Sequence, residues 1–141
     1  MLPADLPAVS ALDRQAFGAD RRFFLERRLS LYPRLCLLLE GEGRIDGFVL
    51  ARQGRSCISV GPVVTSSASA DPALLLSGLA GETGDTELRL GVLDVNPSAI
   101  AMLEAFGLER SPASPWRMIL GESPLPGDPS LAHAIGSPAK G

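Results

Sequence analysis

Apolar residues near the start of the chain recur with the period of a helix. Between residues 5 and 17, leucine, valine and phenylalanine fall roughly along one helical face, and Gly18 follows as a stop. A second stretch of helical spacing lies between Asp20, which can cap a helix, and Pro33, which ends it. The pattern therefore predicts two consecutive helices before residue 34.

Three strand-like runs come next, separated by short turns that contain glycine. They cover residues 35–40, 45–52 and 56–65. Connections of this length can join antiparallel strands, whereas parallel neighbours need a longer crossover. We therefore expect an antiparallel meander of three strands.

The pattern changes after residue 65. A loop of small residues, 66–70, leads into a leucine-rich helix that is expected to begin at Asp71-Pro72 and to end near residues 78–81. The remaining predicted elements are a buried strand over 87–95, a helix from Asn96-Pro97 to Gly107, and two last strands over 108–109 and 116–120. A strand–helix–strand unit after a meander predicts an α/β (α+β) fold, with a mixed sheet and helices on its faces.

Composition and charge restrict the class of protein. The chain has 141 residues, of which 45% are hydrophobic and 21% charged, and its net charge is −3. This balance favours a soluble globular protein and gives no attraction to nucleic acid or to an anionic membrane. Cys36 and Cys57 lack metal-ligand spacing and are expected to be reduced thiols. Because the N-terminus shows no signal-peptide pattern, we expect a cytoplasmic protein.

The chain divides into a predicted domain and a tail. Residues 1–121 carry all the periodic segments and form one domain by length. Residues 122–141 are rich in proline, glycine and serine, and only 131–135 are apolar enough to dock on the domain.

One stretch combines the features of a binding site for a phosphorylated ligand. The strand over 56–65 breaks into a small-residue loop that enters a helix, and helix N-termini offer backbone N–H groups and a positive dipole end. Where two parallel strands diverge, their freed backbone can pair with an extended ligand such as a pantetheine arm. The alternative is a plain junction between a loop and a helix.

Several short motifs occur in a characteristic order. They are Leu12-Asp13-Arg14, Ala16-Phe17-Gly18-Ala19-Asp20-Arg21, Gly61-Pro62-Val63-Val64, Leu93-Asp94-Val95, Asn96-Pro97-Ser98-Ala99, Ala105-Phe106-Gly107-Leu108, Arg117-Met118, Gly127-Asp128-Pro129 and Ala134-Ile135-Gly136. Together they resemble the GNAT superfamily of N-acetyltransferases, and more narrowly the C-terminal GNAT domain of tandem-domain members. The resemblance covers nearly the whole chain. It implies a mixed, mostly antiparallel sheet of about six to seven strands with helices on both faces, and acetyl-CoA or another acyl-CoA as the cofactor.

The resemblance also implies which residues contact the coenzyme. They are Val63, Val64, Thr65, Ser66, Ser67, Ala68, Ser69, Ala70, Asn96 and Leu103. Two departures from the family pattern concern this set. The arginine or glutamine that normally opens the phosphate loop is replaced by Thr65, and the tyrosine that protonates the departing thiolate is replaced by Leu103. Capping of a helix by itself accounts fully for Asn96.

Three ionisable residues are the candidates for acid or base catalysis. Asp94 follows a predicted buried strand, Tyr32 is the only phenol, and His133 is the only histidine. Each also has a structural explanation, as a strand-end cap, a helix-end residue and a tail residue respectively. No Asp or Glu occurs over residues 56–60, where the family often places a general base.

The resemblance implies an N-acetyltransferase in which an amine of a small molecule or peptide attacks the thioester directly. Proximity can supply much of the rate, so a missing side-chain acid is compatible with activity. The alternative is a catalytically silent GNAT-like domain that binds CoA or another ligand, or acts as a dimerisation module. That alternative predicts a homodimer.

Overall fold

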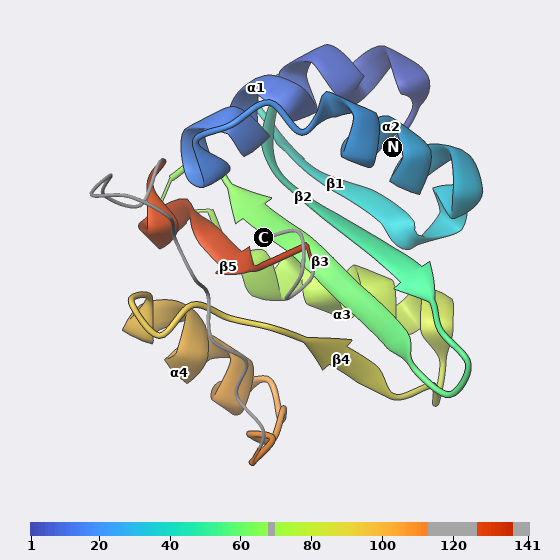
Figure 1. Ribbon diagram of the computed structural model, residues 1–141, viewed down its shortest axis with the longest axis vertical. Helices are drawn as coiled ribbons and strands as arrows, with labels where there is room; N and C mark the ends of the chain where they lie inside the picture. The colour runs from blue at the N-terminus through green and yellow to red at the C-terminus, as the bar shows by residue number, and fades with distance from the viewer. Residues whose placement is uncertain (68–69, 113–126, 137–141) are drawn as a thin grey trace.

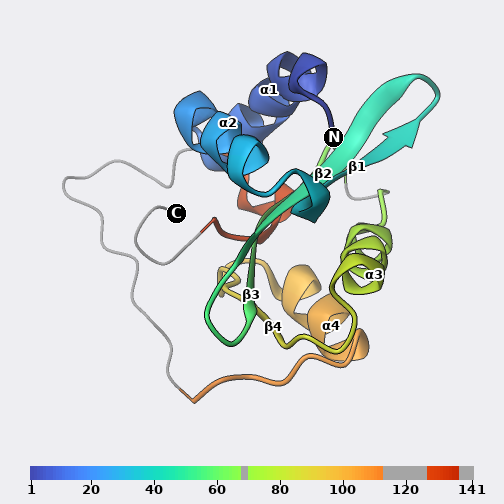
Figure 2. The same ribbon diagram turned by 90° about the vertical axis from the view of Figure 1, so that its right-hand side faces the viewer.

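A central sheet lies between two layers of helices in the computed structural model, which describes residues 1–67, 70–112 and 127–136. The helices are α1 (Leu6–Phe17), α2 (Arg22–Leu31), α3 (Pro72–Thr83) and α4 (Pro97–Ala105). Helices α1 and α2 cover one face of the sheet, and α3 and α4 lie on the other side (Figure 1; Figure 2). Within the described residues, no helix is long and apolar enough to cross a membrane.

The sheet begins with the expected meander. Its strands are β1 (Cys36–Gly41), β2 (Arg44–Gln53), β3 (Ile58–Thr65), β4 (Leu88–Leu90) and β5 (Ala132–Ala134). Strands β1, β2 and β3 pair antiparallel in sequence order, which confirms the meander. Strand β4 pairs parallel to β3, so the sheet is mixed and mostly antiparallel, as expected. Three short 3-10 turns complete the described elements: η1 (Pro3–Asp5), η2 (Pro33–Leu35) and η3 (Pro129–Leu131).

The predicted helix ends are largely confirmed. Helix α1 ends at Gly18, which is left-handed at φ 86°. The side chains of Asp71 and Asn96 cap α3 and α4 by accepting backbone N–H groups. The predicted end of α3 near residues 78–81 is wrong, because the helix continues through both glycines and stops at Gly84.

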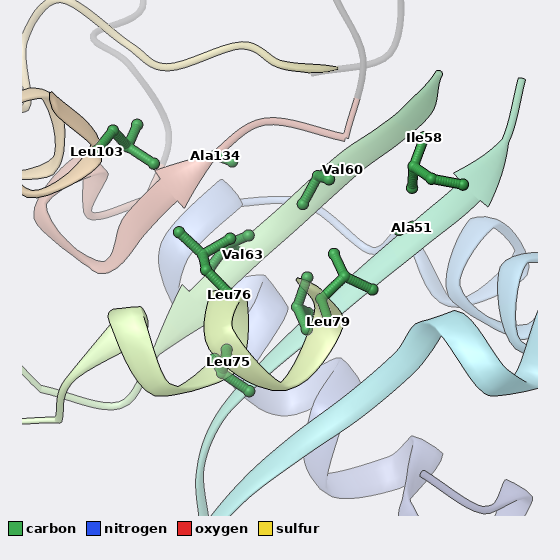
Figure 3. Close-up of a cluster of buried hydrophobic side chains, with 10 residues drawn as sticks. Ala51, Ile58, Val60, Val63, Leu75, Leu76, Leu79, Leu103 and Ala134 are labelled. Carbon is green, nitrogen blue, oxygen red and sulfur yellow. The ribbon is translucent and has the colours of Figure 1, made fainter. Parts of the chain in front are cut away.

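Two apolar cores lie on opposite faces of the sheet, because side chains alternate between the faces along each strand. The core between the sheet and α3 and α4 is drawn in Figure 3; its buried members are Val49, Ala51, Ile58, Val60, Val63, Leu75, Leu76, Leu79, Leu103 and Ala134. The core under α1 and α2 contains Val9, Leu12, Ala16, Leu25, Leu29, Cys36, Phe48, Leu50 and Val64.

The strand count differs from the prediction of six to seven. Five strands occur in the described residues. The expected strand over 87–95 is reduced to Leu88–Leu90, residues 108–109 are irregular, and residues 116–120 lie outside the described part of the chain. The reduction has a structural cause: beyond Val60 the edge of β3 pairs with β5, so β4 loses its partner.

Candidate functional site

Strands β3 and β4 pair at only three positions and then diverge. Their parallel register runs from Ile58 opposite Leu88 to Val60 opposite Leu90. Beyond this point β5 enters the gap, with Ala134 opposite Val63 and Ala132 opposite Val64 (Figure 1). On the other side of the gap, the Ile135 N–H donates to the Gly91 carbonyl at 2.8 Å. The gap that the sequence suggested for a pantetheine arm therefore contains the chain's own residues 132–135.

Asn96 holds the segment that leads into β5. Its Oδ1 accepts the Ala99 N–H at 3.0 Å, which caps α4. Its Nδ2 lies 2.9 Å from the carbonyl oxygen of Pro129, 3.3 Å from that of Ser130 and 3.1 Å from that of Ala132. The side chain is 4% exposed, and its hydrogen-bonding capacity is used within the protein. Capping, one of the two roles considered from sequence, is confirmed.

The start of the same segment is tied to α1. The Asp128 N–H donates to the Gln15 carbonyl at 2.8 Å. Gly127 has φ 84°, and a Cβ there would come within 2.6 Å of the Ala16 oxygen. Only glycine fits this close approach of two backbones. The docked segment 127–136 therefore contacts α1, the Asn96 cap of α4, β3, and Gly91 just after β4.

His133 lies in β5 and reaches the end of β3. Its Nε2 is 2.9 Å from the Thr65 hydroxyl, and both residues are buried. The Thr65 hydroxyl also lies 3.1 Å from the Ser67 carbonyl, to which it can donate. When the single Thr65 proton is given to the Ser67 carbonyl, His133 Nε2–H is the donor in the pair; the other tautomer of His133 reverses the direction of this bond. Nδ1 has no hydrogen-bond partner in the described structure.

This arrangement makes stability depend on pH. Burial lowers the pKa of His133 below its ordinary value of 6.5. The unfolded chain therefore takes up a proton at a higher pH than the folded chain does, and we expect the free energy of unfolding to fall as pH drops below about 6.5. Urea denaturation from pH 8 to pH 5 checks this. His133→Gln, which removes the only imidazole of the chain, should flatten the profile; an unchanged slope would contradict the assignment.

Two described amides of the loop between β3 and α3 already have partners within the protein. The Ser66 N–H donates to the Asp46 carbonyl at 2.8 Å, and the Ala70 N–H lies 3.3 Å from the Ser67 carbonyl. Asp71 Oδ1 accepts the Ala73 N–H at 2.9 Å, so a carboxylate occupies the N-terminus of α3. Ala68 and Ser69, two of the expected phosphate-binding residues, lie outside the described residues. A phosphate at this loop has to compete with the Asp71 carboxylate.

The three acid–base candidates are not gathered at one place. Asp94 is exposed in the turn before α4, and His133 is buried against Thr65. Tyr32 ends α2, where its carbonyl accepts the Cys36 thiol at 3.2 Å. Cys36, which contacts Tyr32, lies opposite Leu50 of β2, and Thr65, which contacts His133, lies opposite Gly47. Leu50 and Gly47 are about 10 Å apart along β2, so Tyr32 and His133 contact different parts of the sheet.

Leu103, which was expected to contact the coenzyme, lies in the apolar core. It is 5% exposed and belongs to the core between the sheet and α3 and α4 (Figure 3). A tyrosine there would have to bury its hydroxyl in an apolar cluster. The position aligned with the family's proton donor is thus a packing position in this chain.

A buried ion pair connects α1 and α2 beside the gap. Arg21 contacts both oxygens of Asp13, with Nη2–Oδ1 at 2.6 Å and Nε–Oδ2 at 3.0 Å, and its guanidinium lies 3.7 Å from the centre of the Phe17 ring. Phe17 and Arg21 line a cavity of about 20 Å³ together with Pro62, Val64, Leu93, Ala132, Ala134, Ile135 and Ala16. That volume suits about one water molecule, so no acyl group fits beside β5 as it stands.

The described residues contain no cluster of metal ligands, and the Cys36 thiol is not ionised at neutral pH. No group of three His, Cys, Asp or Glu residues lies together in the described ranges 1–67, 70–112 and 127–136. Burial raises the pKa of the Cys36 thiol to about 11, so it stays protonated at neutral pH.

Two features of the site were missed from sequence. One is the insertion of β5 between the diverging strands, and the other is the contact of Asn96 with three carbonyls more than thirty residues away. The available signals were weak: Gly61 and Gly91 flank the gap, and residues 131–135 form a mostly apolar run, interrupted by His133, next to Gly136. Neither feature indicates which distant segment of the chain it contacts.

Comparison with known proteins identifies the family. Residues 9–133 match the profile of the acetyltransferase (GNAT) domain. No curated protein matches the chain.

Three solved structures share the fold. A GNAT-family acetyltransferase from Bacillus cereus superposes with a TM-score of 0.61 at 18% identity, over 79% of this chain and 80% of that one. The GNAT-like decarboxylase GphF in complex with isobutyryl-CoA superposes with a TM-score of 0.57 at 21% identity, over 77% of this chain and 70% of that one. A Pyrococcus horikoshii protein with an inferred acetyltransferase assignment superposes with a TM-score of 0.63 at 24% identity. The match covers 100% of this chain and 44% of that longer one. The profile match over residues 9–133, with a mixed sheet between two helical layers like that of these structures, shows that the chain belongs to the GNAT acetyltransferase family.

Proposed function

We propose that the chain is an acyl-CoA-dependent N-acyltransferase that uses acetyl-CoA and acylates an amine of a small molecule or peptide. One observation carries this proposal: the parallel strands β3 and β4 diverge after Val60 and Leu90, beside the loop that enters α3. Divergent strands can pair with a pantetheine arm through their backbone, and the helix N-terminus favours the pyrophosphate. The GphF decarboxylase, which shares the fold, was solved with isobutyryl-CoA.

In the proposed reaction the free amine attacks the thioester carbonyl carbon directly. The new C–N bond forms, the C–S bond breaks, and the proton lost by the amine ends on the departing thiolate. Backbone N–H groups of β3 around residues 59–63 would polarise the carbonyl, with Val63 and Val64 lining the arm. Asp94, Tyr32 and His133 stay the proposed acid–base candidates; the lowered pKa of His133 keeps its imidazole neutral near pH 7.

This reaction requires a rearrangement of the docked segment. Strand β5 pairs with Val63 and Val64, so residues 132–135 have to leave β3 before a pantetheine arm can pair there. The hydrogen bonds of Asn96 and the Thr65–His133 pair oppose that release. Coenzyme binding should therefore speed hydrogen exchange of the Ala132 and Ala134 amides.

Calorimetric titration with acetyl-CoA and desulfo-CoA tests coenzyme binding. We expect binding to be weak and to tighten by about 5–10-fold at low salt in Asp71→Ser, because serine keeps the cap but removes a negative charge from the phosphate site. Asp85→Ser, at the other end of α3, is the matched control and should leave the affinity unchanged. Absence of heat with either coenzyme, in all three proteins, would remove the enzyme proposal.

We also propose a second function, for which the filled gap is the supporting observation. Strand β5 completes the sheet, the remaining cavity measures about 20 Å³, and Leu103 packs in the core. These observations support a catalytically silent GNAT-type domain that binds a different ligand or dimerises. For this silent domain we expect no coenzyme binding in the same titration. We also expect hydrogen exchange of the β5 amides to be slow whether or not coenzyme is present.

A further inference from the structure

An open groove of about 490 Å³ follows the outer edge of β1. Its floor is formed by residues 37–40. One wall is the N-terminal segment with Met1, Leu2 and Asp5, and the other is α3 with Leu74, Leu75 and Gly78. Strand β1 is the last strand on this side of the sheet (Figure 2), and in the described structure nothing pairs with its edge beyond Cys36.

The backbone of β1 presents hydrogen-bonding groups to this groove. The Cys36 carbonyl points away from β2, because it accepts the Met1 nitrogen at 3.1 Å. Successive residues of a strand alternate in direction, so Leu38 and Glu40 also turn their N–H and C=O groups outward, while Leu37 and Leu39 turn theirs to β2. Such an unpaired edge is a template for another strand.

Apolar side chains rim the edge on both sides. Leu2 is 67% exposed on the N-terminal wall, and Leu74 is 58% exposed on α3. Leu37 and Leu39 pack against the core below α3, and Leu38 packs against the core below α1 and α2. A strand laid along β1 would cover leucines on both faces, which is the condition for stable strand addition.

The charges at the two ends of β1 complement each other. Arg34 precedes the strand and is exposed, with a surface ion pair to Glu82 at 3.2 Å. Glu40 and Glu42 are exposed at the opposite end, where Arg44 is held by Asp46 at 2.8 Å. A second β1 in antiparallel orientation brings an Arg34 end against a glutamate end twice, whereas a parallel one brings like charges together.

We propose that β1 of a second copy pairs antiparallel with this edge, so that two sheets join across a two-fold axis into one continuous sheet. The interface is isologous: the same leucines and the same charged ends come from both copies. The occupant is a second copy because the edge is complementary to itself in both charge and apolar character. The proposal does not depend on coenzyme binding or on catalysis.

Sedimentation equilibrium over a wide concentration range tests the dimer. We expect Leu74→Glu and Leu2→Glu each to raise the dissociation constant by at least about 100-fold, since every substitution enters the interface twice. Phe23→Glu is the matched control: Phe23 is 77% exposed on α2, away from the groove, and its substitution should have no effect. Arg34→Glu should weaken the dimer, and adding Glu40→Arg should restore it. A monomer at all concentrations, or equal effects of the Phe23 and Leu74 substitutions, overturns the proposal.

Hydrogen exchange on the unmodified chain gives a second readout that requires no variant. The Leu38 and Glu40 amides should exchange quickly in dilute protein and slowly in concentrated protein. The Leu37 and Leu39 amides, bonded to β2, should be protected at both concentrations. Association without added protection at Leu38 and Glu40 would place the interface elsewhere and overturn the proposal.

Discussion

Gly61→Ala is expected to release β5 from the sheet and to lower the free energy of unfolding by about 3 kcal/mol or more. Gly61 lies between the β4-paired and β5-paired parts of β3 and has φ +136°, a conformation that side chains rarely adopt. A Cβ there would lie 2.8 Å from the Ile135 carbonyl carbon and would collide with its oxygen. Both atoms belong to the Ile135 backbone, whose N–H is hydrogen-bonded to the Gly91 carbonyl, so they cannot move freely.

Urea denaturation and hydrogen exchange measure this effect. The Ala132, Ala134 and Ile135 amides should lose protection in Gly61→Ala, while β1 and β2 keep theirs. Gly81→Ala is the control: Gly81 lies inside α3 with nothing within 4 Å of its Cβ position, so alanine should stabilise the protein by about 0.5–1 kcal/mol. If Gly61→Ala is as stable as the unmodified protein, β5 does not occupy the gap in solution.

Asn96→Ala is expected to lower the free energy of unfolding by about 3–4 kcal/mol. Loss of a helix N-cap costs about 0.5–2 kcal/mol, and carbonyls left without a donor add about 1–3 kcal/mol. Asn96 is 4% exposed and contacts three carbonyls of the segment before and within β5, so water cannot replace it without rearrangement.

Two further substitutions separate the functions of Asn96. Asn96→Asp keeps the cap of α4 but loses the donor, so it should destabilise β5 while α4 stays helical. Asp71→Ala removes a cap that is exposed and has no long-range contact, and should cost only about 1 kcal/mol. Equal losses for Asp71→Ala and Asn96→Ala would show that the contacts to the three carbonyls contribute nothing measurable.

The Gly61 and Asn96 substitutions also bear on function. If β5 is needed for stability, release of residues 132–135 by a coenzyme costs the same interactions that these substitutions remove. Tight acyl-CoA binding by the unmodified chain would then require the coenzyme contacts to exceed that cost. A folded variant with β5 released that binds acetyl-CoA better than the unmodified chain would support the acyltransferase; a folded variant with β5 released that still does not bind it would support the silent domain.

The local pattern of the sequence predicted the helices and the meander well. Gly18, Asp71 and Asn96 act within one turn of their own positions, so their roles as helix stop and caps follow from residue type and spacing. The family motifs correctly indicated a GNAT fold over nearly the whole chain. The end of α3 was predicted wrongly because glycine in a helix costs only about 1 kcal/mol, and packing of Gly78 close to Leu37 accommodates it.

The order of the elements around the proposed site was predictable from the sequence, but the contacts between them were not. Residue types indicated a strand, a small-residue loop and a helix N-terminus, and the structure has that order. They did not indicate that Val63 and Val64 pair with β5, that His133 reaches Thr65, or that Leu103 packs in the core. Each of these contacts joins segments far apart in the chain, and no periodicity within a segment encodes its partner.

What the sequence determined by itself is therefore the set of elements, their ends and the family. These depend on interactions between residues a few positions apart, where side-chain chemistry sets the backbone conformation. Only the tertiary structure decided which strand occupies the gap between β3 and β4. Residues 132–135 occupy backbone groups with which a ligand would have to pair, and they are held there by the contacts of Asn96 with Ala132 and of His133 with Thr65 and by the close approach of Gly61 to Ile135.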